Sequence, residues 1–125
     1  MKRIDIYFLL LAVILLLCGA VLGIKMGASE DFTLTPVHAH LNLAGWASLA
    51  LFGLTYRAYP QLAERRLAPF HFIVSAIGSV LLPIGIGLSV LRGQPALAIV
   101  ASLLWLGGVV LFFIQLLTLL RRSES

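Results

Sequence analysis

The sequence predicts an all-α integral membrane protein, a four-helix bundle with both its N- and C-termini in the cytoplasm. Composition is the first reason: 61% of the 125 residues are hydrophobic, 11% are charged, and the mean hydropathy is +1.06, far above that of soluble domains. The second reason is that the apolar residues form four long runs separated by short polar segments. The third is the uneven distribution of basic residues along the chain.

The four apolar runs form a single domain, residues 1–125, with the lipid bilayer as solvent. About 20 residues suffice for a helix to cross the hydrocarbon core. The expected spans are residues about 4–25, 36–59, 69–91 and 96–120. The first run is longer than the apolar core of a signal peptide and lacks an Ala-x-Ala cleavage site, so we expect it to remain in the protein.

The connections between the spans are short and polar. The first loop carries Glu30 and Asp31, and Pro36 then stands where a proline is favoured, in the first turn of the second span. A charged turn at residues 61–66 leads to the third span, and a tight turn at residues 92–95 leads to the fourth.

The basic residues predict the orientation. Lys25 and Arg92 fall on one side of the membrane, and the other side carries Lys2, Arg3, Arg57, Arg65, Arg66, Arg121 and Arg122. Because basic loops stay in the cytoplasm, both termini are predicted there, in a multi-pass protein of a bacterial inner membrane. The net charge of +4 therefore reflects orientation, and no nucleic-acid partner is expected.

Three histidines lie within or beside the predicted spans, where ionisable side chains are costly and indicate function. His38 and His40 begin the second span two positions apart, so they point to nearly opposite sides of the helix. Histidines that share a metal ion on a helix usually stand four residues apart, so this pair is not expected to chelate one ion together. His71, early in the third span, is expected to have a structural role at the membrane interface.

The surroundings of His38 and His40 suit a flat cofactor. Asn42 and Gly45 share the face of His38, and Trp46 flanks it. Haem needs an axial imidazole and a wall without bulky side chains, so we predict His38 and His40 as haem ligands and the other three as lining residues. The alternative is that both histidines are polar interfacial residues bonded to water or lipid headgroups.

The His-x-His motif is followed by small and aromatic residues in a recognisable order. The segments are Val37-His38-Ala39-His40-Leu41-Asn42-Leu43, Gly45-Trp46, Phe52-Gly53 and Tyr59-Pro60. They resemble the tenth helix of the large catalytic subunit of the haem-copper oxidases, in which one histidine binds the low-spin haem and the other the high-spin haem. The NnrS family has comparable helices. That large subunit consists of three arcs of four helices, and this chain resembles one arc.

The resemblance implies a membrane protein that binds haem b, for electron transfer with a respiratory redox partner or for handling haem or a diatomic gas. The sequence contains no tandem His-His pair for copper and no accompanying tyrosine, so no complete oxygen- or nitric-oxide-reducing site is visible. Enzymatic activity and catalytic residues therefore stay unassigned. Two alternatives remain: a copper-binding or assembly partner of a respiratory complex, and a structural membrane subunit without a ligand.

One protomer of four helices is too small to enclose a haem, so we expect a homo-oligomer. In a ring, His38 of one protomer would face His40 of the next, and the three-arc resemblance implies a trimer, with a dimer as the alternative. Lys25 and Arg92 lie at the same membrane level and are expected to pair with haem propionates. Met26 is an alternative second ligand within one protomer.

Overall fold

The computed structural model describes residues 3–123 and the side chains of residues 3–120, so Lys2 and the side chains of Arg121 and Arg122 lie outside the described residues. The described part is helical and contains no strand. Its elements are α1 (Ile4–Ser29), α2 (Thr35–His40), η1 (Leu41–Ala47), α3 (Ser48–Ala58), η2 (Pro60–Leu62), α4 (Leu67–Arg92) and α5 (Ala96–Ser123). The prediction of an all-α chain is confirmed.

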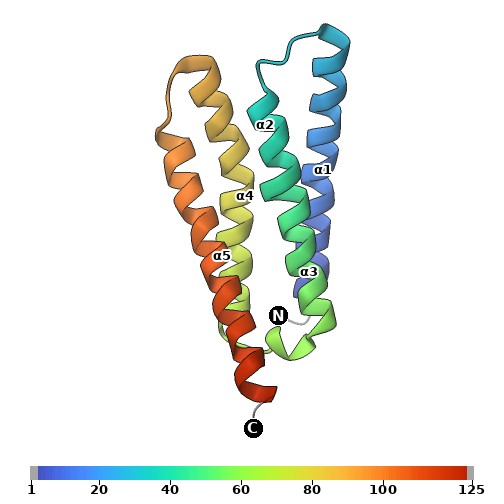
Figure 1. Cartoon of the computed structure of the whole chain (residues 1–125), viewed down its shortest axis with the longest axis vertical. Coiled ribbons are helices and arrows are strands. Elements are labelled where there is room, and N and C mark those ends of the chain that lie inside the picture. Colours follow the sequence, from blue (N-terminus) through green and yellow to red (C-terminus); the bar gives the residue numbers. More distant parts are fainter. Residues whose placement is uncertain (1–2, 124–125) are drawn as a thin grey trace.

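The second predicted span is divided into three helical types. Its middle part, η1, is a π-helix, and α2, η1 and α3 follow one another without a break as one helical column beside α1 (Figure 1). Among the described residues, three helices are long and apolar enough to cross a membrane, namely α1, α4 and α5. They cover the first, third and fourth predicted spans and extend past the predicted ends, as α1 does to Ser29.

The helices run up and down, so both termini lie at the same end of the bundle (Figure 1). The opposite end carries the two loops that join α1 to α2 and α4 to α5. The packing divides into two pairs, because α1 packs most extensively on η1 and α3, whereas α4 packs on α5. This arrangement follows from the short connections, which leave consecutive helices adjacent and antiparallel.

Small residues bring α4 and α5 close together. A Cβ atom added to Gly78 would lie 2.7 Å from the backbone nitrogen of Trp105, and one added to Gly85 would collide with the backbone at Ala98. Such close backbone approach is typical of helices that associate in lipid, where dispersion contacts take over from the hydrophobic effect. The helix α4 continues through Pro83 and ends at Arg92. The next residue, Gly93, has the left-handed φ of 65° favoured in a C-terminal cap.

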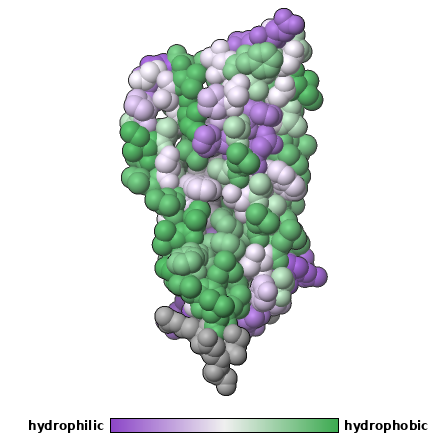
Figure 2. All heavy atoms as spheres, viewed as in Figure 1, coloured by the Kyte–Doolittle hydropathy of each residue, from purple (hydrophilic) through white to green (hydrophobic). Residues whose placement is uncertain are grey.

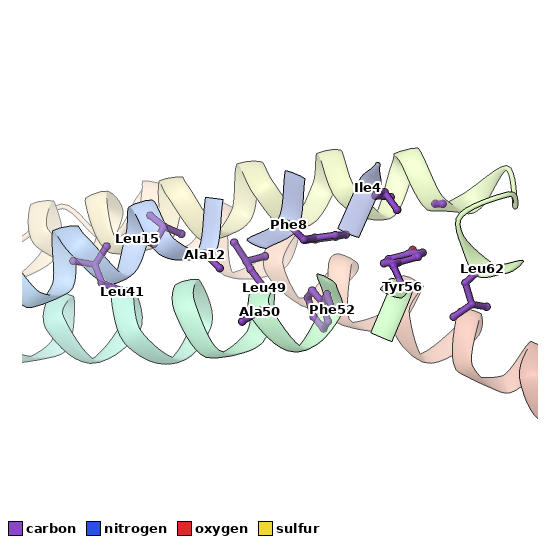
Figure 3. Packing of buried hydrophobic residues seen from close by; sticks show 11 residues of the cluster. Ile4, Phe8, Ala12, Leu15, Leu41, Leu49, Ala50, Phe52, Tyr56 and Leu62 are labelled. Atoms are coloured by element: carbon purple, nitrogen blue, oxygen red, sulfur yellow. The ribbon is translucent and has the colours of Figure 1, made fainter. Parts of the chain in front are cut away.

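The core is aromatic toward the end that carries the termini. Phe8 of α1 lies across from Phe52 and Tyr56 of α3, and Ile4 and Leu62 lie further along the same row (Figure 3). The Phe8 and Phe52 rings meet edge to face with centroids 5.7 Å apart, an arrangement favoured by the ring quadrupoles. This cluster joins α1 to the second helical column.

The face of the molecule that Figure 2 shows is largely apolar, with hydrophilic side chains at the ends and around α2. Large aliphatic side chains are more than half exposed on several helices, for example Ile24 of α1 and Leu103 of α5. In water such extensive apolar exposure would be unfavourable, whereas in contact with a lipid bilayer it costs nothing.

Candidate functional site

His38 faces α1. Its Nδ1 lies 2.8 Å from the backbone oxygen of Gly19, so the ring donates a hydrogen bond across the helix pair. The missing side chain of Gly23 gives this ring its space, because a Cβ atom there would lie 2.8 Å from Cε1 of His38. Two glycines one turn apart on α1 therefore form the seat of the imidazole, which remains partly buried.

Asn42 stands one turn after His38 and packs on Gly19. Its Nδ2 donates to the backbone oxygen of His38 over 2.8 Å and lies close to the position that a Cβ of Gly19 would occupy. The distance of 3.5 Å from Asn42 Nδ2 to His38 Nδ1 joins two nitrogen donors, so we do not count it as a hydrogen bond. Asn42 thus fixes the helix turn on which His38 stands.

His40 lies on another side of the second column. Its Nδ1 is 2.8 Å from the backbone oxygen of Pro36, one turn earlier in the same helix. The ring borders an open groove of about 320 Å³ between the second column and the α4–α5 pair. The groove is lined by His40, Leu43, Ala44, Ser48, Leu82, Ser102 and Trp105.

The imidazole rings of His38 and His40 are the same tautomer. A carbonyl oxygen only accepts, so each Nδ1 carries the hydrogen, and each neutral ring then presents a lone pair on Nε2. Among the side chains of residues 3–120, neither Nε2 has a hydrogen-bond partner. Ligands of metal centres are commonly oriented in this way, with one ring nitrogen bonded to a carbonyl and the other directed at the metal.

The π-helix η1 borders the same groove. The backbone oxygen of Ala44 accepts two hydrogen bonds from other helices, from Oγ of Ser79 over 3.0 Å and from Nε1 of Trp105 over 3.2 Å. Wider π turns disturb the usual helical ladder, and in an apolar environment a freed carbonyl needs another donor. The hydrogen bonds from Ser79 and Trp105 fasten the second column to α4 and α5.

The other predicted lining residues have separate places. Gly45 packs on Leu15 of α1, and Trp46 is partly buried against the core. The side chains of Lys25 and Arg92 are exposed, Lys25 in the last turns of α1 and Arg92 at the end of α4, whereas Met26 is buried. The structure thus brings Asn42 together with His38 and leaves His40 on the groove.

His71 lies in the core of the described structure and not on its surface. Its side chain is 0% exposed, and its ring contacts Phe8, Phe52, Tyr56 and Phe112 at centroid distances of 4.8 to 5.7 Å. Its Nδ1 lies 2.9 Å from the Tyr56 hydroxyl. The aromatic residues exclude water and lipid headgroups from the ring. The Tyr56 hydroxyl provides one hydrogen bond that water or a headgroup would otherwise make.

Sequence reasoning missed three polar residues of the core. Gln115 is fully buried and donates from Nε2 to the Tyr56 oxygen over 3.2 Å, and Asp5 is 7% exposed and lies 3.6 Å from Arg57. The signal for Gln115 was its amide side chain within the fourth apolar run, because such a group in lipid needs a hydrogen-bond partner inside the protein. Tyr56 carried no comparable signal.

The described side chains contain no group of three or more histidine, cysteine, aspartate or glutamate residues placed to hold a metal ion. Comparisons of this chain with models of known protein families, with curated proteins and with solved structures find no match.

Proposed function

We propose that this chain is a multi-pass protein of the bacterial inner membrane that binds haem b, for electron transfer or for handling haem or a diatomic gas. The observation that carries the proposal is the matched state of His38 and His40. Each imidazole has its Nδ1 bonded to a backbone carbonyl at 2.8 Å and its Nε2 free to act as a ligand. Polar groups in a predicted span are costly, and two so prepared in one turn indicate a bound group.

Haem fits these residues better than a bare copper ion. The porphyrin provides four nitrogen donors, so that iron needs one imidazole on each face, whereas a copper ion needs most of its ligands from the protein. No cluster of three such donors is present among the described side chains. When bound, haem b supplies a one-electron couple and an iron that can take a gas ligand.

The residues of the groove can receive an apolar, planar group beside His40. Leu43, Ala44 and Leu82 give apolar walls, and Trp105 adds an aromatic surface. The groove has a volume of about 320 Å³ and is open. It would therefore cover only one side of a large cofactor. A second protomer would cover the other side, which supports a homo-oligomer.

In the assembly that we propose, His38 of one protomer and His40 of the next bind one haem between them. A ring of three is the leading arrangement, and a dimer is the alternative. Lys25 and Arg92, both exposed, are then available to the propionates. The His38 ring lies against Gly19 and Gly23 of α1, so in this assembly its Nε2 would bind the haem beside α1, at the contact with the next protomer.

An absorption spectrum of the purified chain from haem-replete cells tests the proposal. We expect a Soret band, and we expect His40→Ala to abolish it or to shift it to a five-coordinate form. His71→Ala is the control, because it removes a fully buried imidazole. Both variants are compared in preparations that circular dichroism shows to be folded, and His71→Ala should leave the band in place. Loss from both variants alike would contradict the assignment, and so would a haem-loaded monomer with bis-histidine spectra.

The orientation is tested separately. We propose that both termini are cytoplasmic, because the end of the bundle with the termini carries Arg3, Arg57, Arg65 and Arg66, and the other end carries Lys25 and Arg92. A topology reporter fused after Ser125 should be active in the cytoplasm. Activity in the periplasm would reverse the orientation and place the histidine pair on the cytoplasmic side.

A further inference from the structure

A pocket of about 260 Å³ lies at the end of the bundle that carries the termini. It is enclosed by the start of α1, the end of α3 and the turn that contains η2. Four of its lining residues are charged, namely Arg3, Asp5, Arg57 and Glu64. Two are basic and two are acidic, so the formal charges in the pocket cancel. A ligand with a single charge meets both signs there, whereas a ligand that carries one charge of each sign finds a partner for both.

Asp5 is the buried charge of this pocket. It stands in the first turn of α1 and is 7% exposed, although carboxylates are rarely buried unless they are paired. Its ion pair joins Oδ2 to Nη1 of Arg57 over 3.6 Å, which is longer than a hydrogen bond. Within the described part of the chain, no group donates a hydrogen bond to this carboxylate. A cationic group with N–H donors would therefore complete its interactions.

Arg57 is free to exchange its contact with Asp5 for a contact with a ligand. Its side chain is 74% exposed at the end of α3. An ion pair with so exposed a partner adds little to stability, so its rearrangement costs little. Arg3 is a second exposed guanidinium, on the α1 side of the pocket. Guanidinium groups bind phosphate oxygens through paired N–H donors, so these two arginines can receive a phosphate group.

The pocket adjoins the apolar surface of the bundle. Leu54 lies one turn before Arg57 on α3, Leu10 lies two turns after Arg3 on α1, and both leucines are more than half exposed. Tyr59, next to the pocket, is nearly half exposed. Tyrosine is enriched at the level where headgroups meet hydrocarbon. A ligand with its charged part in the pocket can therefore lay a hydrocarbon part along the neighbouring helices.

We propose that this pocket binds the headgroup of a phospholipid with a primary ammonium, of the phosphatidylethanolamine class. The ammonium donates hydrogen bonds to the Asp5 carboxylate, and the phosphate accepts them from Arg57 and Arg3. The short ethanolamine link keeps the two charges of the headgroup close together, as the charges of Asp5 and Arg57 are. The ammonium of phosphatidylcholine has methyl groups in place of its N–H donors. An anionic lipid without an amine would leave Asp5 without a cationic partner from the ligand.

The lipid preference is measured on the full chain in nanodiscs that contain phosphatidylethanolamine, phosphatidylcholine and phosphatidylglycerol in equal amounts, with the same acyl chains. Native mass spectrometry then identifies the lipids that stay bound to the released protein. Phosphatidylethanolamine should be retained about tenfold over phosphatidylcholine, because only its ammonium donates charge-assisted hydrogen bonds. Equal retention of the three lipids would overturn the proposal. A preference for phosphatidylglycerol would also overturn it, and would indicate general attraction of anionic lipid to the basic end of the bundle.

Two matched variants locate the site. Asp5→Asn keeps the size of the side chain and removes its charge, so the retention of phosphatidylethanolamine over phosphatidylcholine should fall about tenfold, to near equality. Asp31→Asn makes the same change in the loop at the other end of the bundle and should leave the preference unchanged. Circular dichroism checks that both variants are folded. A preference that persists in Asp5→Asn, or an equal loss in Asp31→Asn, would contradict the assignment.

A soluble competitor separates a membrane lipid from a free headgroup. Glycerophosphoethanolamine carries the same charges without acyl chains, so at the concentration of the lipid it should not displace the bound phospholipid. Displacement would overturn the lipid assignment. The measurement is independent of haem, because the pocket lies at the end of the bundle away from His38 and His40.

Discussion

At the end of the bundle that carries both termini, His71 is fully buried among aromatic rings, whereas toward the other end His38 and His40 are partly exposed and each bonds a backbone carbonyl. The difference lies in the neighbours rather than in the residue. Aromatic side chains enclose His71, and glycines or an open groove leave room beside the other two. An imidazole in this bundle is thus fully buried where aromatic rings surround it and partly exposed where glycines or an open groove adjoin it.

The largest effect on stability is expected at His71. His71→Ala leaves a cavity among aromatic rings and removes one of the two hydrogen bonds of the Tyr56 hydroxyl, so the free energy of unfolding should fall by about 3 kcal/mol. His40→Ala should change it by less than about 0.5 kcal/mol, because the ring is at the surface of the bundle. Unfolding by a denaturing detergent, followed by circular dichroism, compares the two. Equal losses of unfolding free energy in the two variants would contradict the proposed difference between the two ends of the bundle.

A smaller effect is expected at the seat of His38. Gly23→Ala adds a Cβ atom 2.8 Å from Cε1 of His38, which displaces the ring from Gly19 and should cost roughly 1 to 2 kcal/mol. The same substitution at Gly27, where no atom lies within 4 Å, is the control and should alter stability by no more than about 0.5 kcal/mol. The same unfolding assay applies. If the two variants behave alike, the glycine seat has no energetic role.

Two hydrogen bonds to the Ala44 oxygen hold the π-helix η1 beside the groove. Ser79→Ala removes one of the two hydrogen bonds to the Ala44 oxygen and leaves that of Trp105. We expect a loss of about 1 kcal/mol, the usual value of one buried hydrogen bond. The position of His40 should stay unchanged in the NMR spectrum, since Trp105 still holds the carbonyl. A large shift of the His40 NMR signals would show that the hydrogen bond from Ser79 alone holds the second column in place.

The smallest effect concerns the loop next to the histidine pair. Hydrogen bonds from the Thr33 hydroxyl at 2.6 Å and the Thr33 backbone at 3.0 Å lower the pKa of Asp31 below its usual value of 3.8. Thr33→Val should raise this pKa, as measured by NMR titration of the carboxyl carbon. Because the folded pKa is depressed, the stabilisation is complete above pH 3.8 and is lost as the pH falls through the lower folded value. The variant should thus differ from the parent chain at neutral pH and match it in strong acid.

The helices were predictable and the core polar network was not. Hydrophobic runs dictate the length of a helix that spans lipid, so α1, α4 and α5 were located within a few residues. Tyr56 and Gln115 are 59 positions apart, and no local pattern relates two residues that meet only after the bundle forms. The π-helix was also hidden, because Leu41–Ala47 contains residues that suit an ordinary helix. The opposite directions of His38 and His40 followed from their spacing alone.

The π-helix η1 amounts to one extra residue accommodated within a continuous column, with α2 on one side of it and α3 on the other. Deleting one residue there, at Leu43 for example, would let the column close into a regular α-helix. Because the wider turn absorbs the extra residue, α2 and α3 should keep their relative orientation after the deletion, and His38 should stay on the glycines of α1. If the same residues formed a regular α-helix without a deletion, each would turn the helix by about 100°, and α2 would rotate relative to α3, which Phe52 and Tyr56 anchor. His38 would then leave the glycines of α1, so the widened turn sets the direction in which the histidines point.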